Sequence, residues 1–186
     1  MTEVMIDLET LSTNSDAAII SIGAVKFNPR GDIGVLEDET AVGDIPYRHF
    51  YQNIDMYSLT EASFHISGQT LKWWFSQSPE ARESLSADQV DIGTALSRFY
   101  LWFGEESLPT WGNGAGFDNV VLRNAFQKLG GQSPFRFTHD RCFRTMKALF
   151  PDVNYVTPVL AHNALSDAEA QAVHLQKLFN RINTKG

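Results

Sequence analysis

Cysteine is nearly absent from the chain: Cys142 stands alone among 186 residues, which excludes an intramolecular disulfide bond. There is also no cluster of cysteine and histidine with the spacing of a zinc site. No apolar run approaches the ~20 residues that a membrane-spanning helix needs. The N-terminus leads directly into the apolar run at Val4, which leaves no room for a signal peptide. These absences lead us to expect a cytoplasmic protein with no membrane segment.

Repeats and low-complexity segments are absent as well, while 43% of the residues are hydrophobic and 12% are aromatic. This composition is typical of a folded protein and argues against disorder. A chain of 186 residues has the ordinary size of one domain and can bury a substantial core. We therefore expect residues 1–186 to form a single domain.

Short apolar runs separated by Gly, Pro and Asn predict strands that are later interleaved with helices. The expected strands cover residues 4–9, 18–27, 47–54, 108–111 and 135–137. The expected helices cover residues 58–76 in two pieces around Gly68, 90–103, 117–129, 140–149 and 167–182. Three early strands, followed by strands that alternate with helices, predict the α/β class with a mixed sheet flanked by α-helices.

Four acidic residues and one histidine carry the main functional signal. Asp7 and Glu9 lie two positions apart in the first expected strand, so both side chains project from one face. Asp118 follows a glycine-rich loop and begins an expected helix, where the helix dipole favours a carboxylate. His162 lies in the loop before the last expected helix, and Asp167 lies at the start of that helix.

These residue types suit the hydrolysis of a phosphodiester bond. Cleavage by water requires a hydroxide at neutral pH and stabilised charge on the attacking and leaving oxygens, which two Mg²⁺ or Mn²⁺ ions about 3.5–4 Å apart can provide. Such hard cations prefer carboxylate oxygens as ligands. A histidine that does not bind metal can accept the proton of the attacking water. The five residues together therefore predict a two-metal phosphodiester-cleaving site.

Each residue taken singly has a simpler interpretation. A D-x-E pair occurs by chance in many chains, and Asp118 or Asp167 alone would be a helix cap. His162 alone would be a surface or structural histidine. The order of the motifs, their expected placement and their flanking residues all agree with the metal-dependent nuclease hypothesis.

The motifs resemble those of the DnaQ-like, or DEDDh, 3′–5′ exonuclease superfamily, which has an RNase H-like fold. The family pattern is D-x-E in the first strand, then N-x-x-x-F-D, then H-x-x-x-x-D near the C-terminus. The matching segments here are residues 7–9, 113–118 and 162–167, which span most of the chain. Position 163 is Asn, so the branch that carries Tyr four residues before the last Asp is not supported.

The resemblance assigns a role to each site residue. Asp7, Glu9 and Asp167 would hold the catalytic metal. Asp7 would also bridge to the second metal, and Asp118 would support that second site. His162 would be the general base.

Further positions resemble parts of the same family that contact substrate. Thr10 and Leu11 correspond to a position that contacts the terminal base, and Phe117 corresponds to one that packs near the terminal nucleotides. The stretch that contains Trp73 and Trp74 is similar to small bacterial exoribonucleases and phage or prophage exodeoxyribonucleases. Adjacent tryptophans most simply pack one ring in the core and one over a helix face; a part in shaping the substrate groove is the alternative.

The charge balance limits how nucleic acid would be held. The 15 Lys and Arg against 22 Asp and Glu give a formal net charge of −7, whereas proteins that grip long duplexes are usually basic. An enzyme that trims a terminus needs to hold only a few nucleotides, and stacking contributes ~1–3 kcal/mol per base. The local cations that could flank such a groove, or simply form a solvated helix face, are Arg123, Arg136, Arg141, Arg144 and Lys147.

We therefore expect an enzyme that hydrolyses single-stranded RNA or DNA from the 3′ end with Mg²⁺ or Mn²⁺ and releases nucleoside 5′-monophosphates. The resemblance also implies a homodimer. Two alternatives remain on the same fold: an RNase H-like endonuclease and a non-catalytic nucleic-acid-binding module. The sequence does not distinguish DNA from RNA, because that choice depends on contacts to the 2′-OH.

Overall fold

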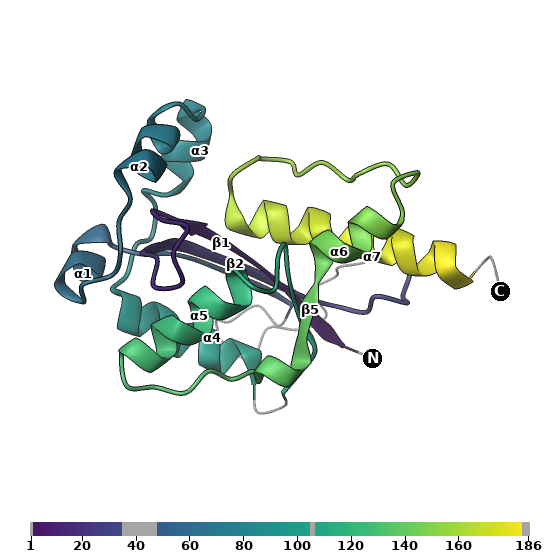
Figure 1. Cartoon of the computed structure of the whole chain (residues 1–186), viewed down its shortest axis with the longest axis horizontal. Coiled ribbons are helices and arrows are strands. Elements are labelled where there is room, and N and C mark those ends of the chain that lie inside the picture. The colour runs from purple at the N-terminus through teal and green to yellow at the C-terminus, as the bar shows by residue number, and fades with distance from the viewer. Residues whose placement is uncertain (1, 35–47, 105–106, 184–186) are drawn as a thin grey trace.

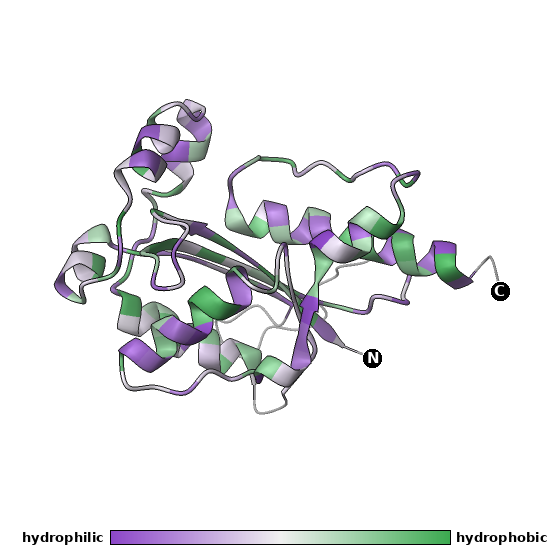
Figure 2. Ribbon diagram, viewed as in Figure 1, coloured by the Kyte–Doolittle hydropathy of each residue, from purple (hydrophilic) through white to green (hydrophobic). Residues whose placement is uncertain are grey.

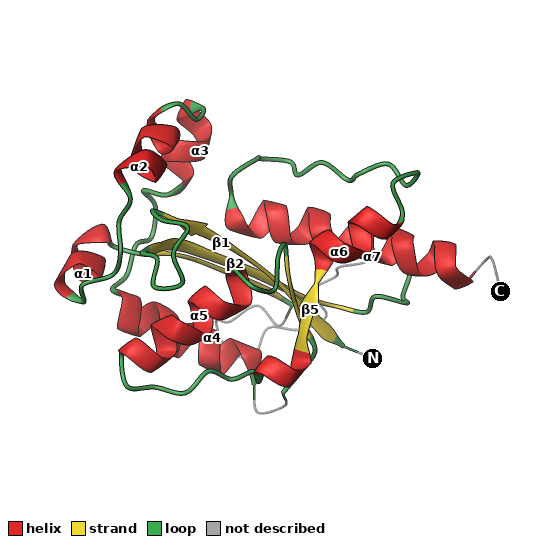
Figure 3. Cartoon of the chain, viewed as in Figure 1, coloured by secondary structure: helices red, strands yellow, loops and turns green. Residues whose placement is uncertain are grey.

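The first strand lies at the centre of a mixed five-stranded sheet with the order β3-β2-β1-β4-β5. β1 and β2 pair antiparallel, as do β2 and β3, whereas β4 runs parallel to β1 and β5 runs parallel to β4. The strands are β1 (Glu3–Thr10), β2 (Ile19–Phe27), β3 (His49–Asn53), β4 (Thr110–Gly112) and β5 (Asp140–Cys142). This sheet confirms the predicted α/β class (Figure 3). The computed structural model describes residues 2–34, 48–104 and 107–183.

Helices cover both faces of this sheet (Figure 1). α4 and α5 lie on one face, and α6 and α7 lie on the other, while α1, α2 and α3 form the segment between β3 and α4. The helices are α1 (Met56–Glu61), α2 (Gly68–Phe75), α3 (Pro79–Ser84), α4 (Ile92–Phe103), α5 (Asp118–Lys128), α6 (Phe143–Leu149) and α7 (Ala164–Asn183). Among the described helices, none has both the length and the hydrophobicity that crossing a membrane would require.

Side-chain alternation along β1 divides the core into two layers. Val4 and Ile6 pack in the cluster that includes residues of α4 and α5, whereas Met5 packs with residues of α6 and α7. Hydrophobic residues accordingly recur along the helices on both sides of the sheet (Figure 2). Because alternate residues of a strand face opposite sides, Asp7 and Glu9 share the α7 side with Met5.

Around β5 one predicted element is wrong and another begins later than expected. Residues 135–137 do not form a strand: Phe135 is buried in the core, and Phe137 begins a short 3-10 turn that ends at His139. The strand follows at Asp140–Cys142, and the helix begins at Phe143 instead of residue 140. The Phe-Arg-Phe alternation suggested a half-buried strand at residues 135–137, but parallel pairing with β4 selects a polar edge strand at residues 140–142.

Other boundaries also differ from the expectation. The last helix begins at Ala164 and not at Asp167, because Asn163 accepts a hydrogen bond from the Ser166 N–H at its Oδ1, 3.1 Å away, and so caps the helix. The helical stretch 58–76 is resolved into α1 and α2, and Gly68 begins α2. The expectation omitted α3, although Ser78 caps it and Pro79 occupies its first turn. Residue 47, the expected start of the third strand, lies outside the described residues.

Candidate active site

A glycine on β2 brings α7 onto the carboxylates of β1. Gly23 is the strand partner of Asp7, and a Cβ on Gly23 would lie only 2.1 Å from the backbone carbonyl carbon of Ala164. The first turn of α7 therefore rests directly on the sheet, which brings Asp167 next to Asp7 and Glu9. One carboxylate oxygen from each of these three acids lies within 4.8 Å of the others.

Asp118 begins α5 and lies outside this group of three. Its side chain is 4% exposed, and backbone N–H groups of Leu8 and Asn113 donate hydrogen bonds to its carboxylate. Gly112 leaves room for this arrangement, because a Cβ there would lie 3.0 Å from the Cβ of Asp118 and 2.5 Å from Oδ1 of Asn119. The fourth acid is thus held at the start of α5, against Gly112 at the end of β4.

The carboxylates repel one another in a site with little water. Burial, followed by the charges of Asp118, Glu9 and Asp167, raises the pKa of Asp7 well above its ordinary value. Burial and the charges of Asp167 and Asp118 raise the pKa of Glu9 to about 8. Burial raises the pKa of Asp118 to about 7, and it also raises the pKa of Asp167. An all-oxygen set of converging carboxylates that resist ionisation fits hard divalent cations, whose charge would offset the repulsion.

His162 is tied to the same cluster by its backbone. The His162 N–H donates to Oδ2 of Asp167 at 2.9 Å, and the residue adopts a left-handed conformation with φ of 62°. Its ring meets Trp73 edge to face at a centroid distance of 4.9 Å and lies 6.3 Å from Trp74. The turn before α7 therefore ties the His162 backbone to Asp167 and packs the imidazole against the tryptophan pair.

The two tryptophans have different environments. Trp74 is 5% exposed and donates its indole N–H to the carbonyl oxygen of Thr10 at 2.9 Å. Trp73 is 42% exposed and lines a groove of about 460 Å³ with Glu9, Thr10 and Phe117. Trp74 thus packs in the core as the simpler interpretation expects, whereas Trp73 contributes to the groove beside the carboxylates.

The three residues expected to contact substrate, Thr10, Leu11 and Phe117, also divide between the groove and the core. Thr10 and Phe117 line the groove beside Glu9. Leu11 is 4% exposed and packs in the hydrophobic core. The structure therefore brings Thr10 and Phe117 to the groove and leaves the side chain of Leu11 in the core.

Sequence reasoning missed two residues that belong to this site. Gln171 is 1% exposed and donates from Nε2 to Oδ1 of Asp7 at 2.7 Å. Its position four residues after Asp167 on the same helix face is the signal that could have identified it. Tyr155 is the second: burial and the charges of Asp167 and Asp7 raise the pKa of its hydroxyl, so the phenol lies in the field of the carboxylates. It lies in a loop, where no periodic pattern marks it.

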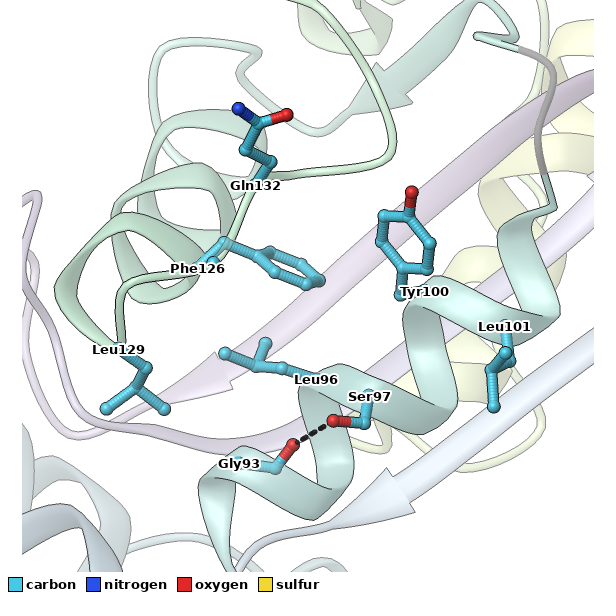
Figure 4. Close-up of a pocket in the computed structure, with 9 residues that line it drawn as sticks. Gly93, Leu96, Ser97, Tyr100, Leu101, Phe126, Leu129 and Gln132 are labelled. Atoms are coloured by element: carbon cyan, nitrogen blue, oxygen red, sulfur yellow. Dashed lines mark hydrogen bonds between the residues drawn. The ribbon is translucent and has the colours of Figure 1, made fainter.

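A separate groove of about 550 Å³ lies between α4 and α5 (Figure 4). Leu96 and Tyr100 line it from α4, Phe126 lines it from α5, and Leu129 lines it from just after the end of α5. No carboxylate or imidazole occurs among the described residues that line it. This groove therefore has none of the carboxylates that a two-metal site requires, and the carboxylate cluster is the candidate site.

Comparisons with known proteins agree with this geometry. A family model described as the 3′–5′ exoribonuclease Rv2179c-like domain matches residues 2–179. The exodeoxyribonuclease of Enterobacteria phage T4 is 25% identical over 165 residues, which cover 78% of this chain and 70% of the phage protein.

Solved structures of E. coli exonuclease I share the fold. The complex with a dT13 oligonucleotide has a TM-score of 0.63 at 16% identity and covers 99% of this chain. The zinc-bound complex with single-stranded DNA has a TM-score of 0.61 at 17% identity and covers 98% of this chain. The chain spans 42% and 43% of the length of these two exonuclease I chains. The fold is accordingly the RNase H-like fold of DnaQ-like exonucleases.

Proposed function

Because the chain belongs to the Rv2179c-like 3′–5′ exoribonuclease domain family, and is therefore a 3′–5′ exonuclease, we propose that it trims single-stranded RNA or DNA and releases nucleoside 5′-monophosphates. The observation that carries this proposal is the convergence of Asp7, Glu9 and Asp167 within 4.8 Å, with the backbone N–H of His162 bonded to Asp167. Carboxylates for hard cations and a neighbouring proton acceptor are the groups that phosphodiester hydrolysis needs.

The carboxylate set supports Mg²⁺ or Mn²⁺ as the cofactor. Asp7, Glu9 and Asp167 would hold the first ion; Asp7 and Asp118 would support a second. Bound divalent ions would lower the pKa of the attacking water and stabilise charge on the phosphoryl oxygens. The raised pKa of Asp7, Glu9 and Asp118 supports this assignment, because carboxylates that repel one another gain most from a cation.

His162 would accept the proton from the attacking water. Its backbone bond to Asp167 and its ring contact with Trp73 support this role, because they restrict the imidazole to the neighbourhood of Asp167. A general base of this kind contributes ~10²–10⁴-fold to a rate. Asn163 and Ser166 have structural roles instead: the Asn163 side chain caps α7, and the Ser166 hydroxyl accepts from the Leu160 N–H.

The groove beside Glu9 would hold the terminal nucleotides. Trp73 and Phe117 present aromatic surface there, and Thr10 adds a polar group. Aromatic side chains stack on any base, which suits an enzyme that trims ends without reading sequence. The complexes of exonuclease I with dT13 and with single-stranded DNA support a single strand as the substrate on this fold.

We also propose that the protein is cytoplasmic and acts as a homodimer. The lone Cys142, which suits a reducing compartment, is the basis for the cytoplasmic location. The resemblance to small exonucleases is the basis for the homodimer. Phe75, Leu149 and Val159 are exposed apolar side chains that a second copy could cover. Light scattering at micromolar concentration is expected to give twice the chain mass, and a monomeric mass would contradict the homodimer.

Matched DNA and RNA oligomers with a 5′ label test the main proposal. In Mg²⁺ or Mn²⁺ the label should move through a ladder of products shortened one nucleotide at a time, and EDTA should abolish the reaction. Asp7→Asn should be nearly inactive, because it removes charge from the shared ligand. Internal fragments would indicate an endonuclease, and binding without any product would indicate a non-catalytic module.

A further inference from the structure

The acidic site must bind a polyanion, so the positions of nearby cations matter. The structure gives different environments to the five cations that the sequence offers for substrate binding. Arg123 is committed to Asp140, with 2.7 Å from each of its two terminal nitrogens to a carboxylate oxygen. Arg136 lines a different groove together with Phe137. Arg141 is exposed and donates to the backbone oxygen of Asp140.

Arg144 lies on the Asp118 side of the cluster. Its Nη2 donates to the carbonyl oxygen of Asn113 at 2.7 Å, which anchors an exposed side chain to the loop before Asp118. The guanidinium lies next to Gly114, where an added Cβ would make an ordinary contact of 3.4 Å with its central carbon. The charge of Arg144 also lowers the pKa of Asp118. A guanidinium has five N–H donors, and the anchoring bond uses one of them.

Lys147 lies one turn further along α6, over the ring of Tyr155, whose hydroxyl lies in the field of Asp167 and Asp7. Residues three apart on a helix share a face, with about 5–6 Å between their Cβ atoms. The Lys147 ammonium lies 4.8 Å from the ring centroid of Tyr155. Tyr155 in turn packs against His174 at 5.3 Å, and His174 lies two turns after Asp167 on the same face of α7.

We propose that Arg144 and Lys147 form a phosphate-binding wall on α6, which holds two adjacent phosphate groups of the single strand beside the carboxylate cluster. This inference rests on the proposed function and adds the residues that bind the substrate backbone. The two cations lie one turn apart and are positioned independently, Arg144 by Asn113 and Lys147 by Tyr155. Both are the hydrogen-bond donors that phosphate oxygens prefer.

The wall also resolves the conflict between a net charge of −7 and a nucleic-acid substrate. Two cations placed at the site oppose the repulsion between the carboxylates and the incoming phosphates. Backbone contacts carry no sequence information, so the wall positions any strand. The aromatic groove at Trp73 and Phe117 lies on the side of Glu9, so bases and phosphates would occupy separate surfaces.

Salt dependence of binding tests the wall directly. Each lost phosphate contact should reduce the slope of log K against log salt by about 0.7 for a single strand. We expect that reduction for Arg144→Ala and for Lys147→Ala, and about twice that reduction for the double variant. The probe is a 5′-fluorescent single strand with a hydrolysis-resistant 3′-terminal phosphorothioate, in Mg²⁺. Arg141→Ala is the matched control and should keep the parental slope.

Two further measurements keep the test decisive. Arg144→Gln and Lys147→Gln retain a long polar stem and replace an alanine variant that does not fold. Arg144→Lys keeps the positive charge and should retain the parental slope of log K against log salt. A neutral methylphosphonate can replace one linkage at a time near the 3′ end of the strand. At the linkage that the wall contacts, this replacement should remove the difference in affinity between the parent and the wall variant. If the parent enzyme is active and every wall variant keeps the parental slope of log K against log salt, the phosphate-binding wall is wrong and the proposed function stands. A parent that releases no mononucleotides would instead overturn the proposed function.

Discussion

The side-chain amide of Gln171 donates a hydrogen bond to the carboxylate of Asp7, with 2.7 Å between Nε2 and Oδ1. This bond links α7 to β1 at the residue that we expect both metals to share. A buried amide donor beside a carboxylate fixes which oxygen is turned toward the cluster. Removal of a group that orients a metal ligand typically lowers metal affinity or activity by ~10–100-fold.

Gln171→Leu is therefore expected to raise the Mg²⁺ or Mn²⁺ concentration that gives half-maximal activity by ~10–100-fold. Titration of each metal against initial rate measures this shift. Gln176→Leu is the matched control: Gln176 lies on the same helix and is equally buried, but it bonds to Gly34 and Asn28. Equal metal dependence in Gln171→Leu and the parent would contradict a positioning role.

Gly23→Ala should damage both stability and activity. Its Cβ would lie 2.1 Å from the backbone of Ala164, so α7 must move away from β2 and carry Asp167 with it. Overpacking of this kind costs ~1–3 kcal/mol in the free energy of unfolding, which urea denaturation can measure. Gly68→Ala is the control, because nothing lies within 4 Å of the added Cβ. A fully active and fully stable Gly23→Ala would show that this contact does not set the position of α7.

The metal-free protein should lose stability as pH rises. Glu9 has an ordinary pKa of 4.5 and a folded pKa of about 8, so between these values the folded state holds a proton that the unfolded state releases. The stability contributed by this group is complete below pH 4.5 and is lost as pH approaches 8. Thermal unfolding in EDTA should show this loss in the parent.

Glu9→Gln isolates the effect, because it keeps the shape of the side chain without the charge. In EDTA at pH 8 this variant should unfold at a higher temperature than the parent, and the difference should shrink toward pH 4.5. Mg²⁺ or Mn²⁺ should stabilise the parent more than the variant. A parental melting temperature above that of Glu9→Gln throughout the range would contradict carboxylate repulsion in the folded state.

Replacement of His162 should separate turnover from binding. Asn tolerates the left-handed backbone that His162 adopts, so His162→Asn removes the imidazole with little strain. We expect single-turnover hydrolysis to fall ~10²–10⁴-fold while metal and oligonucleotide binding stay near the parental values. Asp167→Ala should weaken metal binding itself. Near-parental turnover by His162→Asn would require another proton acceptor.

Trp73 and Trp74 should respond differently to removal. Trp74→Ala deletes a buried ring and its bond to Thr10, so it should lower the free energy of unfolding by ~3–5 kcal/mol. Trp73→Ala should leave most of the stability intact but weaken oligonucleotide binding, because the ring lines the groove. Urea denaturation and fluorescence titration give the two readouts. Parental binding by Trp73→Ala would exclude this ring from the substrate surface.

Local patterns were sufficient for much of this protein. The alternation in β1 placed Asp7 and Glu9 on one face, and the glycine-rich loop before Asp118 marked a helix start; β1 and α5 confirm both. The strand at residues 135–137 failed because a three-residue alternation does not specify which residues pair with β4. Pairing is a contact between distant segments, and it selected Asp140–Cys142.

The amino-acid sequence by itself determined the chemical identity of the candidate site, because carboxylates and a histidine at these spacings limit the chemistry available. Only the tertiary structure decided how they meet. The approach of α7 to Gly23 depends on packing between residues far apart in the chain, and so do the bond from Gln171 to Asp7 and the place of Tyr155. Such contacts leave no local period, because their energy comes from surfaces that become neighbours only when the sheet and its helices close together.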